Sequence, residues 1–268
     1  MILQQAKGFL KTPSLWEDTL FEVTQFTFPK IALDSFTPKP IPQNIRLGHQ
    51  IEYIFYQLIK HSQAYDILLF NQPIKADKRT IGEIDFILKN RDNQELIHVE
   101  LTYKFYLIDP TFSEPIQQLI GPNRKDSFYD KLQKIKNKQF KLLQTQEAIN
   151  TLKKSNINIS NIISNTCYKA QLFFPYTHKE FNIFPFERSC ILGYWLTLKE
   201  FNTALFYQNK FYLPTKHEWI ITPHKNEIWK SHTEITAEIV EHHANQNTPM
   251  IWMIKSNSTI EKFFVVWW

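Results

Sequence analysis

The sequence is poor in glycine. Only five glycines occur in 268 residues, at positions 8, 48, 82, 121 and 193. Their spacing forms neither the G-x-G-x-x-G turn of dinucleotide-binding domains nor the G-x-x-x-x-G-K-[S/T] loop of P-loop proteins. Both motifs use glycine because the backbone must approach the bound phosphates closely. Rossmann-type cofactor binding and P-loop nucleotide hydrolysis therefore lack their usual loop in this chain.

Cysteine is also scarce, and long apolar runs are absent. Cys167 and Cys190 leave room for one disulfide, but they exclude a disulfide framework and a cysteine zinc site. No apolar segment approaches the roughly 20 residues that span a bilayer. The first residues contain no continuous apolar stretch of the kind found in secretion signals. We therefore expect a cytoplasmic protein that does not contact a membrane.

What the sequence does contain is enough apolar material for a packed interior. Hydrophobic residues make up 43% of the chain, which argues against disorder. The length fits one domain with a large addition, or two small domains. The formal charge of +5 is a mild basic excess. It fits a polyanionic partner such as nucleic acid, although many proteins of similar charge bind none.

Hydrophobic periodicity predicts an α/β core in the order helix, three strands, helix, strand. The helical spacing is i, i+4, i+7, and the strands show apolar and polar alternation. A Gly-Pro-Asn sequence interrupts the chain before the second helix. The predicted elements are a helix at 46–61, strands at 65–71, 82–88 and 96–105, a long helix from about 126, and a strand at 168–174.

This pattern predicts that the chain has three parts. Residues 1–45 contain four prolines after position 28 and are expected to form an irregular lead-in that packs on the core. Residues 46–175 form the core, and residues 176–268 form an aromatic, β-rich C-terminal subdomain. Aromatic residues at strand spacing are taken as core rather than as base-stacking residues. The candidate strands there are 191–198, 217–222, 250–255 and 262–268, and the tryptophans assigned to the core are Trp195, Trp219, Trp252 and Trp267.

The two alternating strands at 82–88 and 96–105 are expected to form a hairpin. Residues opposite each other in an antiparallel pair share a face, so the register must match apolar with apolar residues. A two-residue turn at Asp92-Asn93 places Asp85 opposite Glu100, and a shift of two residues places Glu83 there instead. Like charges in opposed positions destabilise a sheet. A divalent cation such as Mg²⁺, which takes one or two carboxylates, would neutralise either pair.

Further polar residues are expected near this carboxylate pair. Lys104 shares the face of Glu100, and it can neutralise charge or orient an attacking water. Glu52 lies at the edge of the apolar stripe of the helix at 46–61. A helix that packs by this stripe can direct Glu52 toward the hairpin. The alternative is that this charged face is simply the solvent side of an amphipathic hairpin.

This hairpin resembles the active-site hairpin of the PD-(D/E)XK nuclease superfamily. The resemblance depends on Gly82–Ile87 and His98–Lys104, and it covers roughly residues 46–175. Within the superfamily, the chain is similar to an uncharacterised bacterial family. The shared phrases are His-x-Glu-Leu-x-x-Lys-Phe-Tyr-Leu, at 98–107, and Gly-Pro-Asn-Arg-x-Asp, at 121–126. The implied fold is a restriction-endonuclease-like core, with a mixed sheet flanked by helices.

The resemblance implies Mg²⁺- or Mn²⁺-dependent hydrolysis of phosphodiester bonds, in DNA rather than RNA. Asp85 and Glu100 would hold the metal, together with Glu52 from the first core helix. The superfamily's lysine normally stands two residues after the acid, where this chain has Thr102. Lys104 stands four residues after Glu100. Either a displaced lysine completes the site, or the site is degenerate and binds without cutting. Cleavage of both strands of a duplex would often use two sites, which makes a homodimer possible.

The long helix adds a basic stripe and one amide. The stripe is spaced to contact a phosphate backbone, and the alternative is a solvated helix face. An amide on an apolar stripe needs a hydrogen-bond partner. Gln139 therefore either reaches the edge of the site or bonds to the backbone. The basic residues are Arg124, Lys125, Lys131, Lys134, Lys138 and Lys141, and the residues expected beside the metal ligands are Glu83, His98, Thr102 and Gln139.

Three functions remain open on the sequence. The first is a metal-dependent nuclease. The second is a non-catalytic nucleic-acid-binding module on a degenerate nuclease fold, which the basic stripe and Thr102 favour. The third is a protein-interaction module that uses the aromatic tail as its contact surface.

Overall fold

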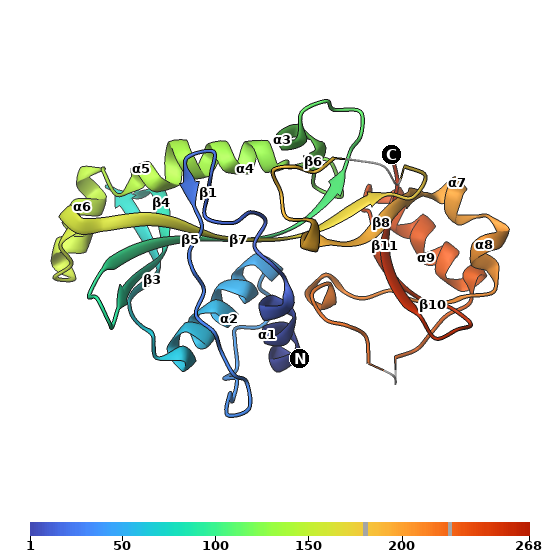
Figure 1. Cartoon of the computed structure of the whole chain (residues 1–268), viewed down its shortest axis with the longest axis horizontal. Helices are drawn as coiled ribbons and strands as arrows, with labels where there is room; N and C mark the ends of the chain where they lie inside the picture. The colour runs from blue at the N-terminus through green and yellow to red at the C-terminus, as the bar shows by residue number, and fades with distance from the viewer. Residues whose placement is uncertain (179–181, 225–226) are drawn as a thin grey trace. The chain divides into compact units, whose positions relative to one another are not determined.

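A computed structural model describes residues 1–178, 182–224 and 227–268. The fold is α/β, with a large mixed sheet flanked by helices (Figure 1). The strands are β1 (Thr19–Leu20), β2 (Val23–Thr24), β3 (Tyr65–Ala76), β4 (Arg79–Asn90), β5 (Leu96–Ile108), β6 (Leu119–Ile120), β7 (Ile162–Pro175), β8 (Ile191–Thr197), β9 (Lys210–Tyr212), β10 (Met250–Ile254) and β11 (Ile260–Val266). The order in the large sheet is β3-β4-β5-β7-β8-β11-β10-β9, and β6 pairs with β5.

The helices include regular, π-helical and 3₁₀ segments. None of those in the described part of the chain is long and apolar enough to cross a membrane. The α-helices are α1 (Ile2–Lys11), α2 (Leu47–Ser62), α3 (Pro115–Gln118), α4 (Phe128–Lys134), α5 (Phe140–Leu142), α6 (Gln146–Lys154), α7 (Leu198–Phe201), α8 (Ala204–Tyr207) and α9 (His232–Ala244). The π-helical turn is η1 (Ile135–Gln139), and the 3₁₀ turns are η2 (Ile159–Asn161), η3 (Arg188–Cys190) and η4 (Lys216–Glu218).

The chain forms two compact units, and neither is a continuous stretch of sequence. Strands β5 and β7 begin in unit 1 and end in unit 2. Unit 1 comprises Met1–Ala6, Ser14–Tyr103 and Asp130–Lys169, and unit 2 comprises Lys7–Pro13, Lys104–Tyr129 and Ala170–Trp268.

In unit 1, α2 follows its predicted bounds closely. Its apolar stripe is buried, and Phe55 packs against Phe86 of β4 with ring centroids 4.6 Å apart. The helix ends at Gln63, which adopts the left-handed conformation (φ 58°) that often terminates helices. The predicted strands are present but longer than expected. The lead-in, expected to be irregular, also contains α1, β1 and β2.

The predicted register of the β4–β5 hairpin is confirmed. Phe86 pairs with Val99, and Leu88 pairs with Ile97. The predicted two-residue turn is wrong, because four residues separate Asn90 from Glu95. The backbone N–H of Asn90 donates to the carbonyl of Glu95 (2.9 Å), and the Asn90 side chain accepts from the N–H of Asp92 (2.9 Å). This side-chain bond stabilises a wider loop without changing the register.

The predicted long helix is interrupted twice. It changes to a π-helical turn at η1, and it stops after α5. Thr145 then caps a new helix, α6, by accepting from the N–H of Ala148 (3.3 Å). Threonine at this position satisfies one of the free N–H groups of the first helical turn. The sequence pattern missed this break because the apolar residues keep helical spacing across it.

The described part of residues 176–268, which lies in unit 2, contains more helix than predicted. Its strands at β8, β10 and β11 match three of the four candidates, but the fourth candidate, residues 217–222, is wrong. That segment begins with the 3₁₀ turn η4. Unit 2 also contains α7, α8 and α9, which the sequence interpretation missed. Ser231 and Glu234 form a capping box at the start of α9, and this signal was readable in the sequence.

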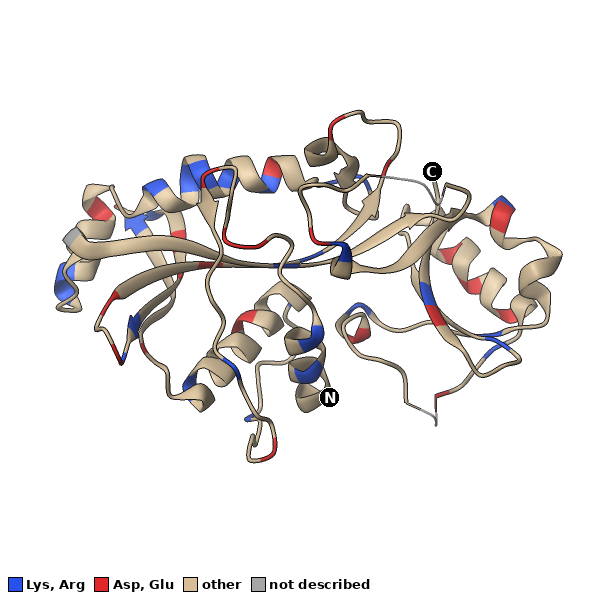
Figure 2. Ribbon diagram, viewed as in Figure 1, with Lys and Arg blue, Asp and Glu red and all other residues tan. Residues whose placement is uncertain are grey.

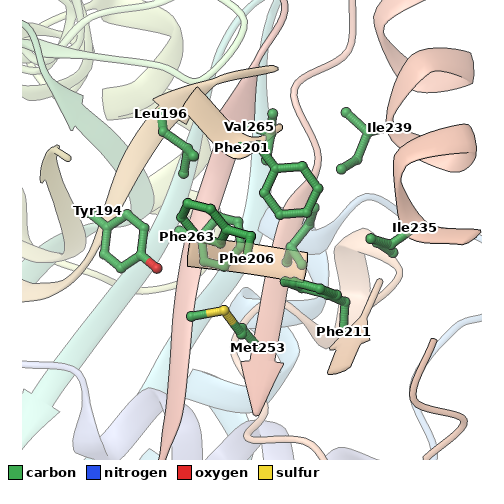
Figure 3. Packing of buried hydrophobic residues seen from close by; sticks show 11 residues of the cluster. Tyr194, Leu196, Phe201, Phe206, Phe211, Ile235, Ile239, Met253, Phe263 and Val265 are labelled. Carbon is green, nitrogen blue, oxygen red and sulfur yellow. The ribbon is translucent and has the colours of Figure 1, made fainter. Parts of the chain in front are cut away.

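The core of unit 2 lies between α9 and one face of β10 and β11. Ile235 and Ile239 of α9 pack with Met253 and Phe263 in an aromatic cluster (Figure 3). Of the four tryptophans that the sequence assigned to the core, only Trp252 is buried, and it does not belong to this cluster. Trp195, Trp219 and Trp267 are half-buried. Both cysteines are buried and free, so no disulfide contributes to the fold.

Candidate active site

The two carboxylates of the hairpin are buried side by side in unit 1. Asp85 of β4 is 8% exposed, and Glu100 of β5 is 1% exposed. The regular ladder between the strands ends at the Phe86–Val99 pair. One residue further on, the Asp85 Oδ2 atom accepts the backbone N–H of Leu101 at 2.9 Å. The aspartate side chain thus takes a hydrogen bond in place of a strand carbonyl, which holds it against β5.

Glu100 is held by two side chains from the helix above it. Lys131 Nζ lies 3.1 Å from Glu100 Oε1, and the amide of Gln139 donates to the same oxygen. Lys131 also donates to Gln139 Oε1 at 3.4 Å. The second carboxylate oxygen, Oε2, is buried and has no hydrogen-bond partner among the described residues. One oxygen of Glu100 is therefore fully engaged and the other is available.

The π-helical turn η1 explains how Gln139 reaches Glu100. Residues eight apart in a regular α-helix differ by about 80° in direction. A π-turn adds one residue to the helix, so Lys131 and Gln139 come to lie on nearly the same face. The two side chains then converge on one carboxylate. Gln139 was predicted either to reach the site edge or to bond to backbone, and the structure places it at the site.

Burial shifts the pKa of both acids upward, and like charge adds to the shift of Asp85. The pKa of Asp85 is raised well above its ordinary value, first by burial and then by the negative charge of Glu100. The N–H of Leu101 opposes this shift. Burial also raises the pKa of Glu100, while Lys131 and Gln139 oppose the rise. The pair therefore attracts either a proton or an additional cation.

A cavity of about 310 Å³ opens beside the pair. Acidic and basic residues both line it. Basic positions, all of them Lys, are frequent along the helix that runs from α4 to α5 (Figure 2). The charged residues in its wall are Glu52, Glu83, Asp85, Glu100, Lys131, Lys134 and Lys138. All of them belong to unit 1. Eight predicted site residues, these seven and Gln139, thus line one cavity.

The face of β5 that carries Glu100 has two more polar atoms for which the described residues offer no hydrogen-bond partner. These are His98 Nε2 and Thr102 Oγ1, both buried. His98 is held by Ser164, whose hydroxyl lies 3.1 Å from His98 Nδ1, and burial lowers the pKa of His98 to about 4. The imidazole is therefore neutral at physiological pH. It flanks the carboxylate without adding positive charge.

Glu52 reaches the cavity from α2, as its helix position predicted. Its Oε2 atom accepts from the amide of Asn71 (2.7 Å) and lies 3.0 Å from His49 Nδ1. It does not join Asp85 and Glu100 in one tight cluster. Across the described ranges, no three His, Cys, Asp or Glu side chains are grouped closely enough to hold a metal ion. Direct coordination would therefore involve the Asp85–Glu100 pair alone.

Lys104, predicted as the catalytic lysine, has a different partner. Its Nζ atom lies 2.6 Å from Asp126 Oδ2, within unit 2. Lys104 is not part of the cavity wall. Lys131 is the lysine that contacts Glu100, and the sequence assigned it only to the basic stripe. Its contact could not be found from spacing, because it depends on where the helix packs on the sheet.

The basic residues that precede α4 do not line the cavity either. Arg124 pairs with the buried Asp109 (2.7 Å), and its guanidinium stacks 3.7 Å from the ring centroid of Trp268. Asn123 accepts the backbone N–H of Thr248 at 2.8 Å. These contacts give the Gly-Pro-Asn-Arg-x-Asp phrase a structural role within unit 2. Lys125 is exposed.

Comparison with protein families matches residues 28–266 to the family described as "Domain of unknown function (DUF1853)". Because the match covers most of the sequence, the chain belongs to this family. The description names no activity, and the match does not connect the chain to the PD-(D/E)XK superfamily. Comparisons with curated proteins and with solved structures give no match.

Proposed function

We propose that this protein is a divalent-metal-dependent nuclease of the PD-(D/E)XK type, acting on DNA in preference to RNA. The observation that supports this proposal is the buried pair of like charges, Asp85 and Glu100, beside a cavity with three lysines in its wall. Two buried carboxylates that repel each other are costly to a fold. Such pairs, with raised pKa values in a cavity, are common at functional sites.

The residues present fit a divalent cation such as Mg²⁺ or Mn²⁺. Mg²⁺ is usually held by one or two carboxylates, and water and phosphate oxygens complete its coordination. Asp85 and Glu100 supply the carboxylates, and Glu100 Oε2 is a buried oxygen with no partner in the described structure. When bound, the cation would lower the pKa of a water molecule and stabilise negative charge at phosphorus. Glu52 would act through a water molecule at the cavity edge.

We assign to Lys131 the part that the sequence gave to Lys104. Lys131 is 18% exposed and already contacts Glu100, so it can hold a phosphate oxygen beside the carboxylate pair. Lys134 and Lys138 lie in the same wall and can contact the flanking phosphates. These three lysines would thus provide positive charge along one side of the substrate.

A non-catalytic nucleic-acid-binding module is the second candidate. Lys131 and Gln139 both engage Glu100 Oε1, and Thr102 occupies the superfamily's lysine position. A carboxylate neutralised by an internal lysine has less need of a metal ion. This candidate predicts binding that weakens steeply with salt and does not change when a chelator is added.

Cleavage assays separate the two candidates. The full chain is incubated with linear, nicked, branched and single-stranded DNA, and with RNA, in Mg²⁺ or Mn²⁺. The double variant Asp85→Asn/Glu100→Gln is compared with Asp92→Asn/Glu95→Gln, which makes the same charge change at exposed positions of the same hairpin.

The nuclease proposal expects metal-dependent cleavage that the first variant lowers at least about 100-fold and the second leaves intact. Equal cleavage by both variants contradicts the proposed site. If every substrate survives but is retained at low salt, the binding module is supported instead.

A further inference from the structure

Unit 2 contains a second cavity that the proposed nuclease does not use. Its volume is about 590 Å³, within the range of roughly 300–1,000 Å³ typical of small-molecule sites. Its wall is formed by the end of α1, by β7, β8, β10 and β11, and by residues near Ile220. All of these wall residues lie in unit 2.

The two central residues of this wall are neighbours across β10 and β11. Trp252 pairs directly with Lys262 in the antiparallel register, so both side chains project from the same face. The adjacent residues, Met253 and Phe263, project from the opposite face into the aromatic cluster with α9 (Figure 3). Strand alternation therefore places Trp252 and Lys262 on the cavity side.

Lys262 is a buried amine whose partners among the described residues are all neutral. It is 8% exposed and donates to the amide oxygen of Gln171. Its Nζ atom lies 5.3 Å from the ring centroid of Trp252 and 5.7 Å from that of Phe173. Within the described residues it forms no salt bridge with a carboxylate. Burial lowers its pKa to about 7. Lysines buried to this extent are normally paired with an acid.

Trp252 adds a second donor without an acceptor. Its indole Nε1 is buried and has no hydrogen-bond partner in the described part of the chain. A buried N–H group without an acceptor costs about 1–3 kcal/mol. One strand pair therefore holds a charged donor and a neutral donor, and neither has an anionic acceptor among the residues that the structure describes.

The remaining charges of the wall also favour an anion. Lys11 and Lys255 are cationic, and Glu261 is the one acid in the described wall. Glu261 is already engaged, because it pairs with Lys255 and accepts the hydroxyl of Tyr194 at 3.1 Å. Apolar side chains, including Phe174, Leu192 and Ile220, make up much of the rest. The cavity thus combines a net positive charge with an apolar surface.

We propose that this cavity binds a small organic anion, a carboxylate or phosphate monoester with an apolar body, whose charged group lies against Lys262 and Trp252. The anion would supply the counter-charge that the described residues do not provide for Lys262. The apolar body would lie along the aromatic and aliphatic wall. The proposal does not depend on the nuclease site, because that site belongs to unit 1.

Calorimetric titration of the full chain with benzoate, phenyl phosphate and benzamide tests this. Benzoate probes the carboxylate, phenyl phosphate probes the phosphate monoester, and neutral benzamide has the same ring without a charge. We expect one of the two anions to bind at least about tenfold more tightly than benzamide. Lys262→Met should weaken anion binding at least about tenfold, whereas Lys199→Met, at an exposed position of α7, should not.

Trp252→Phe keeps a ring in the wall but removes the N–H group, and it should weaken anion binding about fivefold. This variant keeps the test decisive if Lys262→Met does not fold. The proposal is overturned if neither anion binds, if benzamide binds as tightly as the anions, or if both wall variants bind like the wild type.

The pH dependence gives an independent readout. Benzoate affinity should fall as the pH rises above about 7, where Lys262 loses its proton, and should change little in Lys262→Met. The other titratable groups of the wall are Lys11, Lys255, Glu261, Tyr176 and Tyr194. An equal pH dependence in Lys262→Met would assign binding to one of these groups and contradict the role of Lys262.

Discussion

Asp85→Asn should stabilise the protein at neutral pH. The pKa of Asp85 is raised above its ordinary value of 3.8, so the folded state holds this proton more tightly than the unfolded state does. Its contribution to stability is therefore fully present below about pH 4 and is lost as the pH rises through the folded-state pKa. Asparagine does not titrate, and its side-chain oxygen can still accept the N–H of Leu101.

The expected gain follows from the burial of the charge. Asp85 is 8% exposed, its neighbour Glu100 is 1% exposed, and one backbone hydrogen bond compensates Asp85. Relieving a buried, poorly compensated polar group is worth about 1–3 kcal/mol. For a chain of this size, that corresponds to a rise in Tm of about 2–10 °C.

Thermal unfolding between pH 4 and pH 8, followed by circular dichroism, measures this effect without added metal. The difference between Asp85→Asn and the wild type should be small at pH 4 and should grow toward pH 8. Asp92→Asn, in the exposed turn of the same hairpin, should stay within about 0.5 kcal/mol of the wild type. If Asp85→Asn is less stable than the wild type at pH 7, the reasoning on burial and like charge is refuted.

Three further substitutions test separate parts of the structure. Lys131→Met leaves Glu100 buried without its cation, so urea unfolding should show a loss of about 3 kcal/mol at pH 7 and less at pH 5. It should also abolish cleavage, whereas Lys104→Met should not. Arg124→Ala removes the partner of a buried aspartate and the stacking on a tryptophan, and it should cost about 2 kcal/mol by urea unfolding. Ser231→Ala removes the cap of α9 and should cost about 1 kcal/mol in the same assay. If one of these variants is as stable as the wild type, the role assigned to the contact that it removes is contradicted.

The hairpin was predictable because its register is a local property. Alternation in β4 and β5 allows only registers that match apolar residues, and the observed Phe86–Val99 pair belongs to one of the two registers considered. In both registers a carboxylate of β4, either Asp85 or Glu83, lies opposite Glu100, and the observed register is the one that selects Asp85. Alternation did not reveal that the ladder stops there, because that depends on the Asp85 side chain taking the N–H of Leu101.

The contacts of the helix above the hairpin were not predictable from spacing. Lys131 and Gln139 converge on Glu100 only because η1 adds a residue to the helical turn, and no residue type in this segment signals a π-turn. The partner of Lys104 was missed for a related reason. Asp126 is distant along the chain, and a strand pattern gives the face of a lysine but not its partner.

Parts of unit 2 were missed for a different reason. Its aromatic residues fit strands and helices equally well, so composition favoured a β-rich prediction. The capping box at Ser231 and Glu234 was a local signal for α9 and should have outweighed composition. Likewise, Arg124 was assigned to nucleic acid by its charge, and only the fold shows its pairing with Asp109.

Direct measurement of Mn²⁺ binding tests the central claim, that Asp85 and Glu100 form a divalent-cation site. Electron paramagnetic resonance of free Mn²⁺, titrated with the full chain at pH 7.5, gives both affinity and stoichiometry. We predict one site per chain, weakened at least about tenfold in Asp85→Asn/Glu100→Gln and unchanged in Asp92→Asn/Glu95→Gln. Absence of Mn²⁺ binding by the wild type, or equal binding by both double variants, would contradict the account.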